Sequence, residues 1–211
     1  MLSALEALQR LQEGNQRFLS GNLRSCDMLK TLEGRQQLLT GQNPFAVIIG
    51  CSDSRVPVEM IFDQGLGDLF VIRVAGNIVA PSQIGSVEFA AEEFGTRLVV
   101  VLGHTHCGAV NATLKQLQQP VENQSRNSRS IVKRIRPSVE GLLELDLKYN
   151  PQELAKHAVR ANVRVSASHL RYGSEVLEHM IENDELLVVG AEYSLETGIV
   201  EFFDNVPPTM Q

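Results

Sequence analysis

Short apolar runs alternate along the chain with longer amphipathic stretches. Four runs are almost continuously apolar and are bounded by glycine or polar residues: 45–50, 69–74, 97–103 and 186–190. Runs of this length and composition are typical of parallel strands that are buried on both faces. In the tail 188–204, the pattern predicts a turn around Thr197 and Gly198 and then a short final strand.

Helical periodicity fills the stretches between these runs. In 81–95, Ile84, Val87, Ala91 and Phe94 follow helical spacing, and Gly95 is a suitable stop. A second, longer helix is expected over 151–173, because a proline opens it and a glycine closes it. At the N-terminus, leucines at positions 2, 5, 8 and 11 suggest one face of an amphipathic helix.

A strand, a helix and another strand in this order indicate parallel pairing through right-handed crossovers. The predicted fold class is therefore α/β, with about four parallel strands, a C-terminal edge strand and flanking helices. We expect a single domain over 1–211, in which 1–40 form a helical arm and 41–211 form the α/β core.

Composition narrows the class of protein. The chain has 211 residues, of which 43% are hydrophobic and 21% charged, as in a globular protein with a full core. Its net charge of -6 argues against nucleic acid as a partner. No run reaches the roughly 18 apolar residues of a membrane span, and the N-terminus does not resemble a signal peptide. A cytoplasmic protein is the simplest interpretation.

The chain has three cysteines, an odd number that does not suit a disulfide framework. Cys26 lies in a polar stretch without neighbouring His ligands, and we interpret it as a thiol without a role. The other two lie at the ends of predicted strands. Cys51 directly follows the run 45–50, and "HTHC" at 104–107 directly follows the run 97–103.

These strand ends predict a metal site. Because the carboxyl ends of parallel strands line one crevice, Cys51, His104 and Cys107 can meet there. Two thiolates and an imidazole are suitable ligands for Zn²⁺. No fourth Cys or His has a comparable placement, and three protein ligands with an open fourth position are the pattern of catalytic zinc. In that position a water becomes a hydroxide nucleophile near neutral pH. We expect His106 to point elsewhere.

Asp53 and Arg55 leave two arrangements open. Arg55 can hold the Asp53 carboxylate in two hydrogen bonds, which leaves the fourth zinc position free. Alternatively, Asp53 itself binds zinc and closes the site. The sequence thus contains the parts of a switch.

Two other patterns carry less weight. Arg126, Arg129, Lys133, Arg134 and Arg136 form a basic cluster, which we interpret as a solvated helix face. The segment "GLGDLF" at 65–70 precedes a predicted strand and lacks the third glycine, so it is not a dinucleotide fingerprint.

The motifs "CSDSRVP" and "GHTHCGAV", with "FVIRVAGN" between them, resemble those of β-class carbonic anhydrases. The similarity extends to "LQEGNQRF", "SVEFA" and the ending "VVGAEYSLETGIVEF". It implies reversible hydration of CO2 to bicarbonate and a proton, with one Zn²⁺ per subunit held by Cys51, His104 and Cys107. It also implies that Asp53 and Arg55 open or close the fourth position.

The resemblance implies further features. Gln64 matches a position where many members place a glutamine that donates a hydrogen bond to substrate. The family builds its site at a dimer interface, so we expect a homodimer or a dimer of dimers. Some bacterial members are inhibited by bicarbonate in a pocket with a tryptophan, where this chain has Ile48. Arg73 matches the arginine of that pocket, but the pocket looks incomplete, so we do not expect this inhibition.

Two alternatives remain open at this point. The same fold and metal in this family also serve the hydrolysis of CS2 or COS, which the motifs do not separate from CO2 hydration. A non-catalytic zinc module that senses bicarbonate is the other, although the presence of Asp53, Arg55 and Gln64 disfavours it.

Overall fold

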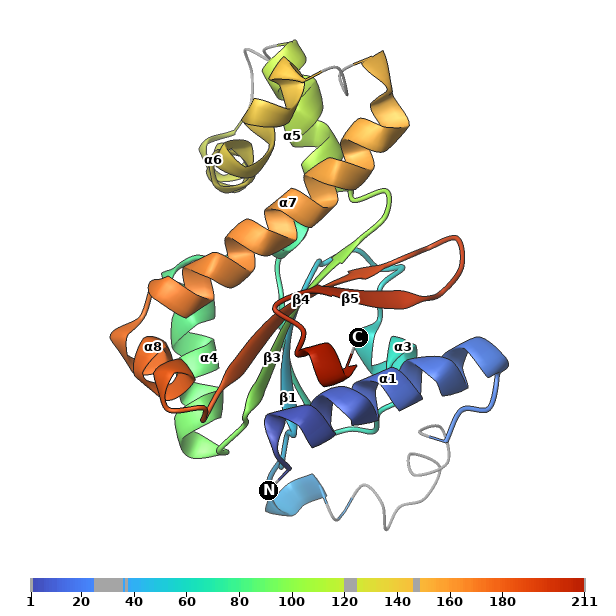
Figure 1. The fold of residues 1–211 in the computed structure, drawn as a ribbon, viewed down its shortest axis with the longest axis vertical. Helices are drawn as coiled ribbons and strands as arrows, with labels where there is room; N and C mark the ends of the chain where they lie inside the picture. The colour runs from blue at the N-terminus through green and yellow to red at the C-terminus, as the bar shows by residue number, and fades with distance from the viewer. Residues whose placement is uncertain (1, 25–35, 37, 120–124, 146–148, 211) are drawn as a thin grey trace.

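The computed structural model describes residues 2–24, 36, 38–119, 125–145 and 149–210 (Figure 1). Cys26, to which we assigned no role, lies outside the described residues. The centre of the fold is a five-stranded sheet in the order β2-β1-β3-β4-β5. The strands are β1 (Ala46–Gly50), β2 (Leu69–Arg73), β3 (Leu98–His104), β4 (Leu187–Tyr193) and β5 (Val200–Asp204).

The pairing of the strands confirms the predicted fold class. β1 pairs in parallel with β2 and β3, β3 pairs in parallel with β4, and β5 is an antiparallel edge strand. The helices are α1 (Ala4–Ser20), α3 (Val58–Ile61), α4 (Pro81–Glu93), α5 (Gly108–Gln118), α6 (Arg126–Val139), α7 (Pro151–Tyr172) and α8 (Glu175–Glu182). Short 3-10 turns cover Leu38–Thr40, Ala75–Asn77, Glu140–Glu144 and Pro208–Met210.

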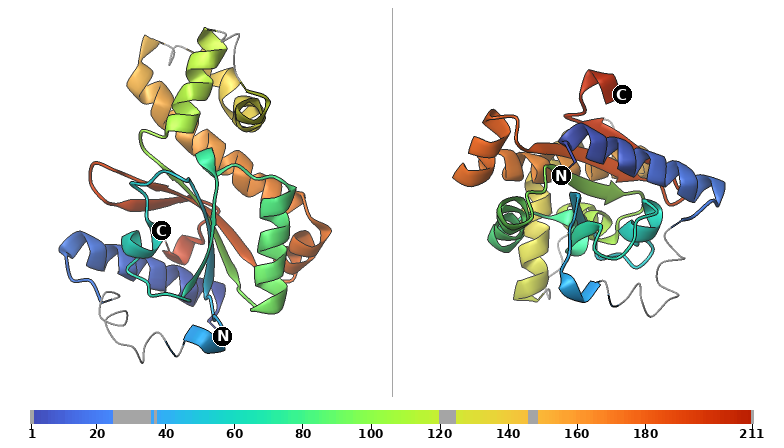
Figure 2. Two further views of the ribbon diagram at one scale, coloured as in Figure 1. Left: turned by 180° about the vertical axis from the view of Figure 1, so that it is seen from behind. Right: turned by 90° about the horizontal axis from the view of Figure 1, so that it is seen from below.

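Each face of the sheet has its own apolar core (Figures 1 and 2). α1 and α3 pack on one face, where Leu8, Leu11 and Phe62 are fully buried. α4, α7 and α8 cover the other face, where Val87, Leu170 and Leu177 meet the opposite side chains of β1 and β3. The strands are near-continuously apolar because both of their faces are buried in this way.

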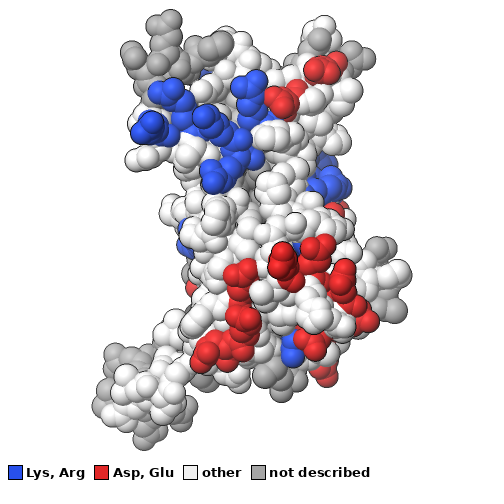
Figure 3. Space-filling model, turned by 90° about the vertical axis from the view of Figure 1, so that its left-hand side faces the viewer, with Lys and Arg blue, Asp and Glu red and all other residues white. Residues whose placement is uncertain are grey.

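A third apolar cluster lies beyond the carboxyl ends of the strands. There α5 and α6 pack against the first half of α7, and the cluster includes Cys51 and Cys107. Their arrangement above the sheet is visible in Figure 1. α6 contributes Ile135 and Val139 to this cluster. Four of the five residues of the predicted basic face are exposed, namely Arg126, Arg129, Lys133 and Arg136, whereas Arg134 is half-buried. Figure 3 shows Lys and Arg side chains gathered over α6.

Local sequence signals set most element boundaries. Asn150 caps α7 by accepting from the amide of Glu153, Pro151 is its first residue, and Gly173 ends it. α1 begins with a capping box in which Ser3 and Glu6 satisfy each other's backbone amides. The division into an arm over 1–40 and a core over 41–211 stays a prediction.

The prediction that the N-terminal leucines share one helix face was wrong in one detail. Leu5 is 43% exposed, while Ala7, Leu8 and Leu11 form the buried stripe of α1. A spacing of three residues drifts around a helix with 3.6 residues per turn, so leucines at every third position cannot all share one face. The structure also adds α3 and α8, for which the sequence pattern gave no expectation.

Candidate metal centre

The two central strands deliver the predicted ligands to one point. From β1 the chain passes through α3, on one face of the sheet, to the neighbouring strand β2. From β3 it passes through the helices α5, α6, α7 and α8, which lie mainly on the other face, to β4. Chain connections therefore diverge at the carboxyl ends of β1 and β3, which is where open α/β sheets form a ligand crevice. Cys51 follows β1 directly, and His104 is the last residue of β3.

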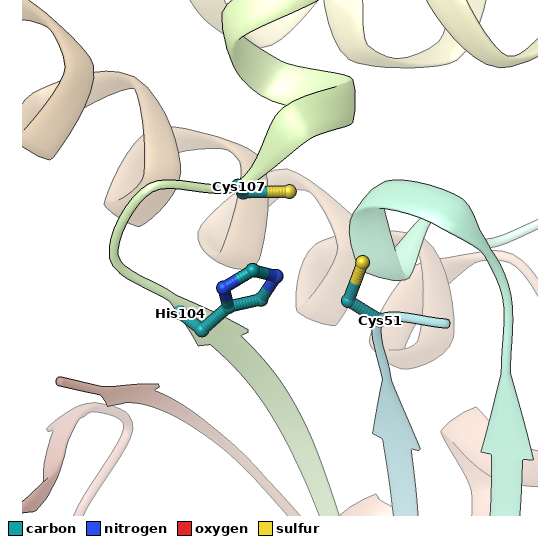
Figure 4. Close-up of side chains that lie close together, drawn as sticks. All are labelled: Cys51, His104 and Cys107. Carbon is teal, nitrogen blue, oxygen red and sulfur yellow. The ribbon is translucent and has the colours of Figure 1, made fainter. Parts of the chain in front are cut away.

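Cys51, His104 and Cys107 converge there from three different directions (Figure 4). One ligand atom of each lies within 4.8 Å of the others, and His104 is completely buried. Cys107 reaches this point because it is the N-cap of α5, so its sulfur faces the first backbone amides of that helix. Two strand ends and one helix start thus form a compact donor set.

The hydrogen bonding of His104 leaves one nitrogen of its imidazole ring available to bind a metal ion. Its Nδ1 lies 2.8 Å from the carbonyl oxygen of Thr105, so the ring donates its N–H there and leaves Nε2 with a lone pair. Nε2 is buried and has no hydrogen-bond partner among the described residues. A buried polar atom without a partner calls for an explanation, and a metal ion supplies one.

The two sulfurs also fit a cation. The hydrogen bond from Cys107 lowers the pKa of Cys51 to about 4, while the same contact and burial raise the pKa of Cys107 far above its usual range. Only one of the two thiols therefore ionises while no cation is present, because two adjacent buried thiolates repel each other. A divalent cation between them removes this conflict, so the residues fit zinc.

Asp53 and Arg55 adopt the first of the two arrangements left open by the sequence. Arg55 donates from Nε to Oδ1 of Asp53 at 2.9 Å and from its terminal nitrogen to Oδ2 at 2.7 Å. These hydrogen bonds hold the pKa of the Asp53 carboxyl far below its usual range, against a smaller opposing effect of burial. Oδ2 lies only 3.8 Å from Nε2 of His104, so the carboxylate borders the metal centre.

The backbone around Cys51 is held by Gly76 and Asn162, which the sequence did not single out, and by Arg73, for which the sequence indicated a different role. The amide of Gly76 donates to the Cys51 sulfur at 3.3 Å, and the side chain of Asn162 on α7 donates to the Gly76 carbonyl at 2.7 Å. Arg73 donates to the carbonyls of Cys51 and Asp53. The one sequence signal for Gly76 was the segment "VAGN" directly after a strand.

His106 points away from the centre, as expected. It is 66% exposed, and its Nε2 lies 2.5 Å from Oε1 of Glu196 in the turn between β4 and β5. The hydroxyl of Thr105 also donates to Glu196 and accepts from the amide of Leu195. The hairpin thereby braces the loop between the candidate ligands His104 and Cys107.

Gln64 lies in a different environment. Its amide donates to the carbonyl of Phe62 at 2.6 Å, and its oxygen accepts from Nε of Arg10 at 3.0 Å. The side chain is buried, and no described hydrogen bond connects it to Cys51, His104, Cys107, Asp53 or Arg55. Ile48 is also fully buried in the core of β1.

Comparisons with known proteins match this chain to carbonic anhydrases. A family model described as carbonic anhydrase matches residues 46–200. The chain is 37% identical over 205 residues to carbonic anhydrase 2 of Mycobacterium tuberculosis, covering 95% of this chain and 93% of that protein. It is also 37% identical to the carbonic anhydrase of Mycolicibacterium smegmatis, with coverage of 92% and 91%.

Solved structures show the same similarity. The β-carbonic anhydrase CcaA has a TM-score of 0.74 and 29% identity, with coverage of 93% of this chain and 94% of that one. The β-carbonic anhydrase CafA of Aspergillus fumigatus has a TM-score of 0.72 and 28% identity, with coverage of 84% and 83%. The chain therefore belongs to the carbonic anhydrase family, in its zinc-dependent β class, and is a lyase that interconverts CO2 and bicarbonate.

Proposed function

We propose that Cys51, His104 and Cys107 hold the zinc ion and that Asp53 and Arg55 carry out the catalytic work beside it. The convergence of the three ligand atoms, with the unpartnered Nε2 of His104 among them, is the main support. Zinc in such a three-ligand site lowers the pKa of a water to about 7 and supplies a hydroxide nucleophile at neutral pH.

In this proposal Asp53 orients the attacking oxygen. An ionised carboxylate accepts a hydrogen bond, which turns the lone pair of that oxygen toward the carbon of CO2. Arg55 keeps the carboxylate ionised and fixes its plane through two charge-assisted hydrogen bonds. If Arg55 released it, the Asp53 carboxylate, whose Oδ2 lies 3.8 Å from Nε2 of His104, would be the residue to supply a fourth ligand and close the site.

Gln64 remains our prediction for a donor to substrate. Its amide already donates to the carbonyl of Phe62 and its oxygen accepts from Arg10, so the role requires an exchange of partners or access from a second subunit. Gln64→Leu removes the donor and keeps most of the volume. We expect it to raise KM for CO2 or bicarbonate more than it changes zinc content.

The test of the proposed site is stopped-flow CO2 hydration from about pH 6.5 to 9 on protein whose zinc content has been measured. We expect activity that rises with pH and is lost, together with zinc, in Cys51→Ala. Full zinc occupancy without CO2 hydration at any pH would contradict the proposal. Parallel assays with CS2 and COS show whether a sulfur analogue is the preferred substrate.

We also propose that the protein works as a homodimer or a dimer of dimers. β2 is an edge strand whose Phe70, Val71 and Ile72 are only half-buried in the single subunit. An apolar edge strand is a suitable template for a second copy. Sedimentation at several protein concentrations tests this, and a monomer at micromolar concentration would contradict it.

A cytoplasmic location is a further proposal. No helix among the described residues is long and apolar enough to cross a bilayer. Support for the cytoplasm comes from Cys51 and Cys107, whose function as ligands requires reduced thiols. Cell fractionation with a tagged full chain tests it, and recovery of the protein outside the cytoplasm would contradict it.

A further inference from the structure

Thr105 lies between the buried imidazole of His104 and the turn that joins β4 to β5. Each of its hydrogen-bonding groups has a partner. Its amide donates to the carbonyl of Tyr193 at 3.0 Å, and its hydroxyl accepts from the amide of Leu195 at 3.0 Å and donates to Glu196 at 2.7 Å. Its carbonyl accepts from Nδ1 of His104 at 2.8 Å. Three contacts therefore fix Thr105 to the hairpin, and the fourth reaches the imidazole.

The direction of the Thr105 carbonyl depends on two backbone angles. The peptide unit between Thr105 and His106 is a rigid plane, so its orientation follows ψ of the first residue and φ of the second. His106 has a φ of +56°, a left-handed value that residues other than glycine keep only where neighbouring contacts hold it. The Glu196 carboxylate supplies such contacts, because it lies 2.5 Å from Nε2 of His106 and accepts from the Thr105 hydroxyl. The hairpin thus holds both residues that aim this carbonyl at His104.

The hairpin is in turn fixed to the N-terminal helix. Asn15 is buried on α1, and its side chain donates to the carbonyl of Gly198 at 3.0 Å and accepts from the amide of Val200 at 2.9 Å. The hydroxyl of Ser194 donates to Glu196 at 3.1 Å within the turn. The Glu196 side chain is 52% exposed, but these contacts hold the turn that carries it.

Glu196 is a constant acceptor for this loop. The hydrogen bond from the Thr105 hydroxyl is the main cause that lowers the pKa of Glu196 to about 2. The carboxylate is therefore ionised at every pH at which CO2 hydration is measured. A charged acceptor makes a shorter and stronger hydrogen bond with a hydroxyl than a neutral one does.

The contact between His104 and Thr105 affects the metal centre directly. When one nitrogen of a histidine binds a metal, the hydrogen bond of the other nitrogen sets the tautomer and the plane of the ring, and it strengthens the ligand. Nε2 of His104 is the buried atom that has no partner among the described residues. The acceptor for Nδ1 is a backbone carbonyl, which no substitution removes, so its direction depends on the side chains that hold the loop.

We propose that Thr105 is a positioning residue for the reaction and that Glu196 acts through it. Thr105 holds the carbonyl that orients the His104 ring and keeps Nε2 directed at the cation. The inference rests on the proposed function of His104 as a zinc ligand. It gives the hairpin a path to the imidazole that is separate from the support of Cys51 by Gly76.

Thr105→Val tests this role, because it removes the hydroxyl and keeps the branched shape. We expect zinc affinity, measured by competition with a chromophoric chelator, to fall about tenfold to 100-fold. The visible absorption bands of the Co²⁺-substituted protein should shift. In NMR spectra the Nδ1–H proton of His104 should move upfield, because its hydrogen bond lengthens. A merely structural role would lower the thermal midpoint and leave both spectra of the folded protein unchanged.

Two further variants separate the hydroxyl from the carboxylate. Thr105→Ser restores the hydroxyl and should return zinc affinity to within about twofold of the wild type. Glu196→Gln removes the charge and keeps an acceptor oxygen, so its loss should be smaller than that of Thr105→Val. Because Glu196 acts through Thr105, the double variant should lose less affinity than the product of the two single losses.

Thr113→Val and Glu153→Gln are matched controls. Thr113 is buried, and its hydroxyl donates to the carbonyl of Ala109 at 2.9 Å within α5. Glu153 is exposed in the first turn of α7. Neither side chain has a described hydrogen bond to residues 104–107. Both variants should keep zinc affinity within about twofold of the wild type.

Wild-type zinc affinity and unchanged spectra in Thr105→Val would overturn the proposal, and so would an equal loss in Thr113→Val. Single losses that multiply in the double variant would contradict the action of Glu196 through Thr105. His104→Ala tests the underlying assignment separately. If that variant kept wild-type zinc affinity, the proposed ligand set would fail and this role with it, whereas a failure of Thr105→Val alone leaves the ligand set intact.

Discussion

The side chain of Asn162 donates a hydrogen bond to the carbonyl of Gly76 at 2.7 Å, although the two residues are 86 positions apart. The amide of Gly76 in turn donates to the sulfur of Cys51, so the middle of α7 helps to position a ligand. Asn162 is buried and Gly76 has a φ of +71°, a conformation that favours glycine. Residues outside the ligand shell that orient ligands in this way set metal affinity.

Asn162→Ala should therefore weaken zinc binding. We expect a loss of about tenfold to 100-fold in zinc affinity, measured by competition with a chromophoric chelator. The sulfur-to-metal absorption of the Co²⁺-substituted protein should also shift, because Cys51 loses a fixed hydrogen bond. Asn111→Ala on the exposed side of α5 is the control and should change neither. Unchanged zinc affinity in Asn162→Ala would contradict this role.

Arg55→Ala should reduce CO2 hydration without removing zinc. Without the two hydrogen bonds from Arg55, Asp53 no longer has a fixed orientation and becomes free to move toward the metal. We expect kcat/KM to fall by about 10²-fold or more, in the range usual for groups that handle protons. Arg55→Lys keeps the charge but not the paired geometry, so it should recover only part of the activity. Wild-type rates in Arg55→Ala at full zinc content would argue against the dyad.

The pH profile should not report the titration of Asp53. Arg55 lowers the pKa of this carboxyl from its ordinary value of about 4, so the group stays ionised throughout pH 6.5 to 9. A lowered pKa means that protonation, and with it the loss of the Arg55 pairing, occurs only in strong acid. We expect Asp53→Asn to reduce the amplitude of kcat/KM and to leave the midpoint of its acidic limb unchanged. A midpoint that moves by one pH unit would show that Asp53 titrates in this range.

Close packing of α7 on β3 predicts an asymmetric response of two glycines next to the ligands. A Cβ at Gly103 would lie 2.6 Å from Val163 and 3.1 Å from Val159, whereas one at Gly108 would have no atom within 4 Å. We expect Gly103→Ala to lower the free energy of unfolding by about 1–3 kcal/mol through overpacking. Gly108→Ala should be neutral or stabilising by up to about 1 kcal/mol. Urea unfolding of both variants provides the comparison, and equal stabilities would contradict the packing argument.

The sequence predicted the sheet and the convergence of three candidate metal ligands because both depend on local patterns. An apolar run that is buried on both faces identifies a parallel strand, and β1, β2, β3 and β4 lie within a few residues of the expected ranges. Since the carboxyl ends of parallel strands share one edge, Cys51, His104 and Cys107 were expected to meet, and the structure brings them together. The proline that opens α7 and the glycine that ends it were equally visible, because they act on neighbouring backbone groups.

Only the tertiary structure decided how the centre is supported and which state the Asp53 carboxylate adopts. Asn162, Arg73 and Glu196 act through contacts between elements that are distant in sequence, for which single-chain spacing contains no signal. The choice of Asp53 between Arg55 and the metal centre depends on distances of a few ångströms at a loop. The sequence by itself therefore determined which groups reach the carboxyl edge of the sheet, through strand periodicity and topology. The packing of α7 and the β4–β5 hairpin determined how those groups are oriented, because orientation depends on contacts that form only when the chain is folded.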